Sequence, residues 1–348
     1  MHILKYGCYD ARMKKTRMTI SAFLLLLLCC LPVLSAHSKD KSTLRHKNMY
    51  QDYEDECIEK GWKKLNISVG GLDRQILWAA PPQGRWVNGA IIALHGGGGS
   101  YSNFCTVPRL AFIPIGKPMN RFADMALRQG FAVFSLDSGW NIFTDQKGHA
   151  CGKRWSSLEQ NKRGNVDLDF IKTVIDKVIP RFRPKGSASD IFMTGISNGG
   201  FMTILASTYF NKDITAFAPV SAGDPYGVYM DCGDTSTKRA NAPGRWYAYG
   251  TNKEMGESGS CHAPEYTDAL DWPRQTASIP FKQFHHEGDK AVDISCMDKA
   301  RKGLTKHSHS DKGAHIIKNQ GRENIFKHLW YDEYNRPMLE FFKQSRSR

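Results

Sequence analysis

The stretch Ile191-Phe192-Met193-Thr194-Gly195-Ile196-Ser197-Asn198-Gly199-Gly200 indicates the fold of this chain most directly. Its first four residues predict a strand, and the apolar residues 201–206 that follow predict a helix. A G-x-S-x-G sequence between a strand and a helix is typical of a nucleophile elbow, a turn so tight that glycines must flank the serine. We therefore expect Ser197 to have a strained backbone conformation and a hydroxyl raised from the edge of a sheet.

Other apolar runs extend this prediction to a whole sheet. Three of them are continuous rather than alternating, which is typical of parallel strands covered on both faces. They lie at residues 90–94, 131–136 and 214–220. Residues 65–69 and 75–80 alternate around Gly70-Gly71 and predict a hairpin. Further strands are predicted at 281–285 and 314–318, and helices at 120–129, 166–179, 294–304 and 337–344. The pattern predicts an α/β-hydrolase fold, a mostly parallel sheet with an antiparallel N-terminal hairpin and helices on both faces.

A serine nucleophile needs a base, and that base needs an orienting carboxylate. In this fold the acid follows the next-to-last strand and the histidine follows the last one. Asp289 meets the first condition, with Asp293 as its nearest rival. His328 meets the second, with His315 as the competitor, although His315 falls within the predicted last strand. His307 and His309 lie in a polar stretch and are predicted to be solvated.

A glycine loop follows the first buried strand, in the sequence Leu94-His95-Gly96-Gly97-Gly98-Gly99. Lipases and esterases carry an HGGG-type loop at this point, where backbone N–H groups stabilise a negative oxygen. We expect one N–H from Gly96 or Gly97, together with that of Asn198, to form such an oxyanion hole. No Gly-Lys-Ser/Thr sequence ends the loop, which excludes a Walker phosphate loop.

The N-terminus predicts export. Residues 1–17 are basic, residues 18–34 are almost wholly apolar, and Ser35-Ala36 offers small residues for cleavage. We interpret 1–36 as a secretory signal peptide, with an uncleaved membrane anchor as the alternative. Residues 37–61 then form a polar lead-in, and residues 62–345 form the catalytic domain. After cleavage no apolar run remains that is long enough to span a membrane.

Charge and cysteine content limit the function classes. The chain of 348 residues has a net charge of +14, but its basic residues are scattered and do not indicate nucleic-acid binding. Six of the nine cysteines follow residue 36, and an even number in an exported protein suggests disulfides. Six cysteines allow 15 pairings, among which the sequence does not choose. No C-x-x-C spacing is present, so no zinc site is predicted. The six are Cys57, Cys105, Cys151, Cys232, Cys261 and Cys296.

Residues 224–278 interrupt the alternation of strands and helices. They are rich in Gly, Pro and polar residues, and we interpret them as a lid or substrate-wall insertion, or as a surface decoration. Four tryptophans are candidates to line an aryl or sugar site, with the protein core as the alternative. They are Trp140, Trp155, Trp246 and Trp330.

Taken together, these motifs resemble the secreted polyhydroxybutyrate depolymerase and feruloyl esterase-like α/β-hydrolases. The resemblance spans roughly residues 62–343. It depends on the glycine loop at 94–99, the helix start at 166–171, the elbow at 194–200, the acid-bearing turn at 286–292 and the terminal His328-Leu329-Trp330. His286 and Glu287 depart from the family pattern, which has Gly and a small residue there.

The resemblance implies a secreted serine esterase with Ser197 as nucleophile, Asp289 as orienting acid and His328 as base, and without a cofactor or metal. Its substrate would be a small or polymeric ester, such as plant polysaccharide esters or hydroxyalkanoate oligomers. Two alternatives stay open. One is a serine peptidase on the same fold, and the other is a catalytically silent binding module.

Overall fold

The computed structural model describes residues 53–107, 109–110, 113–114, 116–138, 155, 165–225, 272–273, 276–289, 292–321 and 327–347. The predicted signal peptide and most of the predicted insertion at 224–278 lie outside the described residues. The same holds for Cys151, Cys232, Cys261, Trp140 and Trp246.

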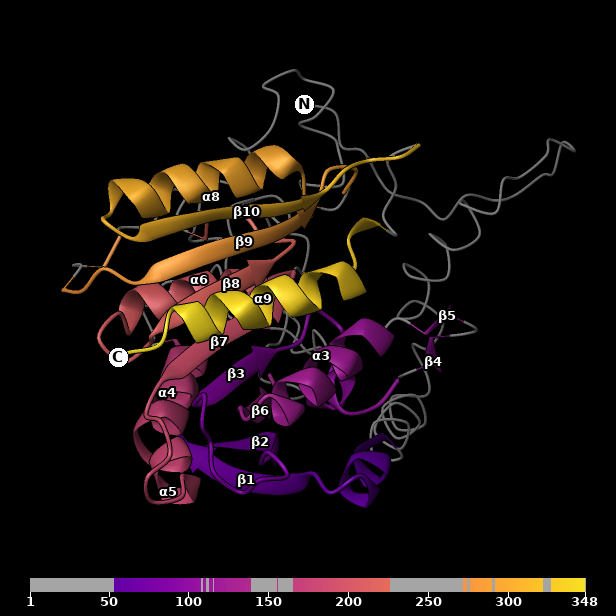
Figure 1. Ribbon diagram of the computed structural model, residues 1–348, viewed down its shortest axis with the longest axis vertical. Helices are drawn as coiled ribbons and strands as arrows, with labels where there is room; N and C mark the ends of the chain where they lie inside the picture. Colours follow the sequence, from indigo (N-terminus) through magenta and orange to yellow (C-terminus); the bar gives the residue numbers. More distant parts are fainter. Residues whose placement is uncertain are drawn as a thin grey trace, which may run out of the picture. The chain divides into compact units, whose positions relative to one another are not determined.

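The described residues form an eight-stranded sheet in the order β1-β2-β6-β3-β7-β8-β9-β10 (Figure 1). The pairs β1–β2 and β2–β6 are antiparallel, and the remaining neighbours are parallel. The predicted mostly parallel sheet with an antiparallel N-terminal hairpin is therefore confirmed. The strands are β1 (Lys63–Val69), β2 (Leu72–Ala79), β3 (Ala90–Leu94), β6 (Ala132–Leu136), β7 (Ile191–Ile196), β8 (Ala216–Val220), β9 (Pro280–His286) and β10 (Ser310–Ile317). A separate ribbon pairs β4 (Arg109–Leu110) with β5 (Ile113–Pro114).

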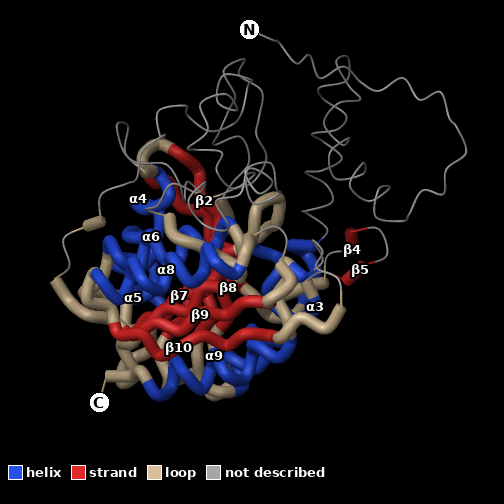
Figure 2. The backbone as a smooth tube through the Cα atoms, turned by 90° about the horizontal axis from the view of Figure 1, so that it is seen from above, coloured by secondary structure: helices blue, strands red, loops and turns tan. Residues whose placement is uncertain are grey.

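Helices cover both faces of the sheet, as Figure 2 shows for α6 and α8 on one side and α9 on the other. The first face packs against α4 (Val166–Thr173), α5 (Ile179–Phe182), α6 (Asn198–Tyr209) and α8 (Ile294–Lys306). A π-helical stretch, η2 (Val174–Val178), joins α4 to α5. The second face packs against α3 (Lys117–Arg128), α9 (Asp332–Gln344) and the short 3-10 helix η1 (Tyr101–Phe104).

This two-sided cover explains the continuous apolar runs of the sequence. Every residue of β3, β6, β7 and β8 is buried, because side chains on both faces of these strands meet a helix. In the part of the chain that the structure describes, no helix has the length and apolar character needed to cross a membrane.

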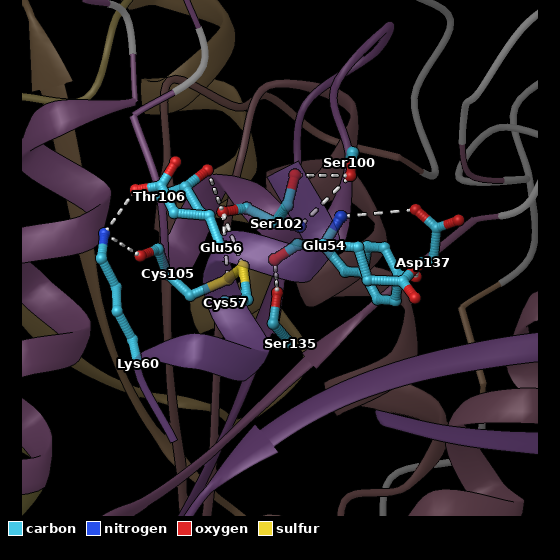
Figure 3. The surroundings of a disulfide bond; sticks show 11 residues. Glu54, Glu56, Cys57, Lys60, Ser100, Ser102, Cys105, Thr106, Ser135 and Asp137 are labelled. Carbon is cyan, nitrogen blue, oxygen red and sulfur yellow. Dashed lines mark hydrogen bonds and ion pairs between the residues drawn. A yellow bond between two sulfur atoms is a disulfide. The ribbon is translucent and has the colours of Figure 1, made fainter. Parts of the chain in front are cut away.

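A disulfide ties an N-terminal helix to the main body (Figure 3). Residues 53–59 are helical, and Cys57 is bonded to Cys105 directly after η1. The hydroxyl of Tyr101 donates a hydrogen bond to buried Glu54 of the same helix. Cys296 is also disulfide-bonded. The packed region therefore begins before residue 62, earlier than the sequence predicts.

A buried ion pair joins β2 to the start of α4. The guanidinium of Arg74 lies 2.5 Å from Asp167 Oδ1, and both side chains are fully buried. Arg74 also donates to the carbonyl oxygen of Val166 at 3.3 Å and lies over the Phe170 ring at 4.1 Å. These contacts compensate for removing both charges from water.

The buried pair gives a stability prediction. We expect Asp167→Ala to lower the free energy of unfolding by about 3–5 kcal/mol, because it leaves the Arg74 charge buried without its carboxylate. Asp176→Ala is the control, since Asp176 pairs with Lys172 on the surface, and it should cost less than about 0.5 kcal/mol. Urea unfolding followed by circular dichroism measures both, and equal losses would contradict this account.

His309 precedes β10 and is buried rather than solvated, so that prediction is wrong. It lies edge-on to Phe217, and among the described residues neither ring nitrogen has a hydrogen-bond partner. Burial, helped by the nearby His307 charge, lowers the pKa of His309 to about 4. His307 is half-buried and stacks on Trp272 at 4.3 Å between ring centroids.

His309 therefore makes stability depend on pH. Between pH 6.5 and about 4 the unfolded chain binds a proton on this ring that the folded chain does not. Stability is then highest above this window and falls as the pH is lowered through it. In the wild type, His309 should account for about 2–3 kcal/mol of the fall in the free energy of unfolding across this pH window. We expect that part of the fall to be absent in His309→Leu, as measured by urea unfolding at several pH values. His307 is only half-buried, so His307→Leu should change the pH dependence of stability less. If His309→Leu kept the pH dependence of the wild type, His309 would not be its source.

Candidate active site

Ser197 stands in a tight turn between β7 and α6. Its backbone has φ 55° and ψ −125°, a combination that L-residues rarely adopt and that costs free energy. The Ser197 N–H donates to the carbonyl oxygen of Val220 at 2.9 Å, and its own carbonyl accepts from the N–H of Phe201 at 2.9 Å. Flanking backbone bonds thus hold the strained conformation that the elbow sequence predicted.

The start of α6 is in close contact with the loop that follows β3. A Cβ atom added to Gly199 would overlap the carbonyl oxygen of His95 and would lie 2.6 Å from that of Leu94. Real Cβ atoms do not approach backbone oxygens so closely, so the elbow and the loop meet only if residue 199 is glycine.

The same contact brings the predicted oxyanion loop beside the elbow. A Cβ built on Gly96 would lie 3.5 Å from the Cβ of Ser197, and one on Gly97 would lie 3.8 Å from the Cβ of Asn198. The N–H of Gly99 donates to the Gly96 carbonyl at 3.0 Å and closes the loop. The structure therefore brings Gly96, Gly97, Ser197 and Asn198 together, as the sequence predicted.

Asp289 and His328 are also brought together, although 39 residues separate them. His328 follows β10 and donates from Nδ1 to Asp289 Oδ2 at 2.7 Å. Asp289 follows β9, is 4% exposed, and accepts the Val292 N–H at 3.0 Å through Oδ1. The carboxylate therefore fixes the orientation of the imidazole.

The surroundings of Asp289 keep it ionised. Burial is the largest single effect and raises the pKa of this carboxyl, but the interactions with His328, with His285 and with the Val292 N–H together lower the pKa below its ordinary value. His285 Nε2 lies 3.6 Å from Asp289 Oδ2 and donates to the Val292 carbonyl at 2.9 Å. Burial lowers the pKa of His285, so its neutral ring helps to shape the turn.

The two halves of the site share one edge of the sheet. The Ser197 N–H bonds the end of β8, and the N–H of Ser221, directly after β8, bonds the Phe284 carbonyl of β9 at 2.9 Å. The elbow follows β7 and the Asp289 turn follows β9, and β7, β8 and β9 are parallel neighbours. Ligands of open α/β sheets bind at this carboxyl edge.

The rival residues have other roles. Asp293 caps α8, since its Oδ1 accepts the backbone N–H and the hydroxyl of Ser295 at 2.9 and 2.6 Å. His315 lies within β10 and packs against the rings of Phe284 and Tyr334. Both contacts are of the kind that structural residues make.

Glu287 was not predicted to matter, yet it links the Asp289 turn to the segment that follows β10. Its Oε2 accepts the Asn319 N–H at 2.9 Å, and its Oε1 lies 3.3 Å from Lys318 Nζ. Both interactions lower the pKa of Glu287, and the hydrogen bond from Asn319 has the larger effect. Lys327, beside His328, in turn donates to the side-chain oxygen of Asn319. Polar contacts thus connect Glu287, Lys318, Asn319 and Lys327 in one group beside His328.

Trp155 and Trp330 are buried, and neither offers an exposed ring to a substrate. Trp330 donates to Asn335 at 2.7 Å and packs on Phe104 and Phe122, as a core residue does. Among the described residues, no group of three or more His, Cys, Asp or Glu side chains is arranged to hold a metal ion.

No family model matches the sequence, and no curated protein sequence matches it either. Similarity to known proteins is found in the structure. An acylaminoacyl peptidase of Pyrococcus horikoshii superposes with a TM-score of 0.52 at 13% identity, over 82% of this chain and 42% of the peptidase. The chain has the α/β-hydrolase fold. It spans less than half the length of that peptidase. The smaller Est1E of Butyrivibrio proteoclasticus superposes over 81% of this chain and 96% of its own, with a TM-score of 0.45 at 16% identity.

The close contact at Gly199 gives a stability prediction for this protein. We expect Gly199→Ala to destabilise the protein by about 3 kcal/mol or more, because its Cβ meets backbone oxygens that cannot move independently. Gly71→Ala is the control, since Gly71 has φ +77° and open space around it, and it should cost only about 1–2 kcal/mol. Urea unfolding of both variants compares them, and an equal cost would mean that the elbow and the loop can separate.

Proposed function

We propose that this protein is a serine hydrolase that cleaves carboxylic esters through an acyl-enzyme. The observation that carries the proposal is the 2.7 Å bond from His328 Nδ1 to buried Asp289, at the same sheet edge as a strained serine. A hydrogen-bonded Asp–His pair and an elbow serine are the parts that activate a hydroxyl nucleophile.

The chemistry follows from the roles of these groups. Ser197 Oγ attacks the ester carbonyl carbon while His328 Nε2 takes its proton, and Asp289 stabilises the resulting imidazolium. The carbonyl oxygen becomes negative and is stabilised by the N–H groups of Asn198 and of Gly96 or Gly97. His328 then protonates the departing alcohol. A water molecule attacks the acyl-enzyme by the same route and releases the acid and Ser197.

We propose aryl or short-chain esters as substrates, including feruloyl or acetyl esters of plant polysaccharide and hydroxyalkanoate oligomers. The resemblance of the glycine loop and the elbow to esterases of this kind supports that choice. We also propose that the protein is exported, which the N-terminal signal pattern and the disulfide between Cys57 and Cys105 support.

A serine peptidase is the second candidate. The observation in its favour is the structural similarity to an acylaminoacyl peptidase. The same Ser, His and Asp groups cleave amides and esters, so the leaving group distinguishes the two activities.

Covalent labelling tests the proposal. A fluorophosphonate probe should label the purified protein at Ser197, and Ser197→Ala should abolish labelling and lower turnover of p-nitrophenyl acetate by about 10³-fold or more. The control Ser68→Ala alters an exposed serine on β1 and should keep full labelling and turnover.

The same purified protein is then tested on p-nitrophenyl esters, methyl ferulate, hydroxybutyrate oligomers and peptides. Ester turnover supports the esterase, whereas peptide cleavage without ester turnover would favour the peptidase. An unlabelled and inactive wild type would instead support a binding module on a hydrolase fold.

A further inference from the structure

Trp155 contacts both parts of the candidate oxyanion hole. Its side chain is completely buried, and its ring lies against the His95 ring with 5.2 Å between centroids. It bonds to His95 on the loop after β3 and to Asn198 at the start of α6. A tryptophan that only filled space in the core would not need polar contacts to both segments.

The contact with Asn198 fixes a side-chain amide at both ends. The backbone N–H of Trp155 donates to Asn198 Oδ1 at 2.5 Å, and Asn198 Nδ2 donates to the Trp155 carbonyl at 3.1 Å. Two opposed hydrogen bonds hold the plane of an amide, as they do between paired strands. Asn198, which is held in this way, is also the residue whose backbone N–H is one of the candidate oxyanion donors.

The contact with His95 sets the direction of a second candidate donor. Trp155 Nε1–H donates to the His95 carbonyl oxygen at 2.9 Å. That carbonyl and the N–H of Gly96 belong to the same peptide unit, and no peptide bond within the described residues is cis. Because a trans peptide is planar, its N–H points opposite to its C=O. Fixing the His95 oxygen therefore fixes the Gly96 N–H.

The His95 ring does the same for the next peptide unit. Its Nδ1 lies 2.7 Å from the Gly96 carbonyl oxygen, to which it donates, and its Nε2 accepts the Ser138 N–H at 3.2 Å. The Gly96 carbonyl shares a peptide plane with the N–H of Gly97. Trp155 packs on this ring, so both candidate loop donors are oriented by one connected network.

We infer that Trp155 is a positioning residue that orients the oxyanion-hole N–H groups of Gly96, Gly97 and Asn198, an inference that rests on the proposed function. Trp155 itself does not contact the reacting atoms in this role. Its effect is preorganisation, which lets the donors stabilise the transition-state charge without first reorienting.

The test removes one hydrogen bond and keeps an aromatic ring. Trp155→Phe loses the Nε1–H that orients the His95 carbonyl. Trp86→Phe is the matched control, since Trp86 is also fully buried but its Nε1 makes no hydrogen bond to any residue that the structure describes. The readouts are kcat and KM for p-nitrophenyl acetate, the inhibition constant of a trifluoromethyl ketone, and urea unfolding. The ketone adds to the serine and places a negative oxygen in the hole.

We expect Trp155→Phe to lower kcat by about 10- to 100-fold, somewhat less than outright loss of a donor, with KM within about twofold. Inhibition by the ketone should weaken by a similar factor. Trp86→Phe should alter stability but neither kcat nor the inhibition constant. An unchanged kcat in folded Trp155→Phe, or a lower kcat with unchanged ketone inhibition, would overturn the inference.

A second variant covers the case in which Trp155→Phe does not fold. Asn198→Ala keeps its backbone N–H but loses both bonds to Trp155, and it should also lower kcat and weaken ketone inhibition. Full activity in Asn198→Ala would contradict the network. These outcomes are distinguishable from failure of the proposed function. In that case the wild type itself would be neither labelled nor active, and the inference about Trp155 would be wrong as well.

Discussion

The backbone of α6 begins so close to the loop after β3 that only glycine fits at position 199. This contact brings the glycine loop to the elbow and keeps the Ser197 conformation from relaxing. It also explains why α6 and the loop after β3 meet through backbone atoms rather than side chains at this point. A side chain at 199 would separate the groups that the proposed chemistry needs side by side. The bonds of His95 and Trp155 then refine an arrangement that this close approach makes possible.

Much of the fold could be predicted because its physical causes are local. Strands covered on both faces must be continuously apolar, and a sharp turn between strand and helix needs glycine on each side. Asp289 and His328 could be located for a related reason. In parallel strands the carboxyl ends share one edge, so a residue's place after its strand predicts where it lies. Pattern and position together thus predicted a pairing across 39 residues.

Other features depend on contacts that no local pattern encodes. In the sequence, Glu287 stands out only as a departure from the pattern of the family that the chain resembles. Its partners Lys318 and Asn319 follow a different strand, β10, so no local pattern indicates the contact. His309 sits in a polar stretch, and only the packing of Phe217 reveals its burial. Helix α9 starts before Pro337, since burial of Tyr334 and Asn335 favours an extra turn despite a proline inside the helix.

The disulfide at Cys57 has a practical consequence for choosing gene boundaries. A fragment expressed from residue 62 would leave Cys105 as a lone thiol beneath the surface and would deprive the Tyr101 phenol of its carboxylate acceptor, Glu54. The segment that follows the glycine loop would then lose its covalent anchor. Recombinant versions should therefore begin upstream of residue 53 and be produced in an oxidising compartment, so that the bridge forms as the chain folds.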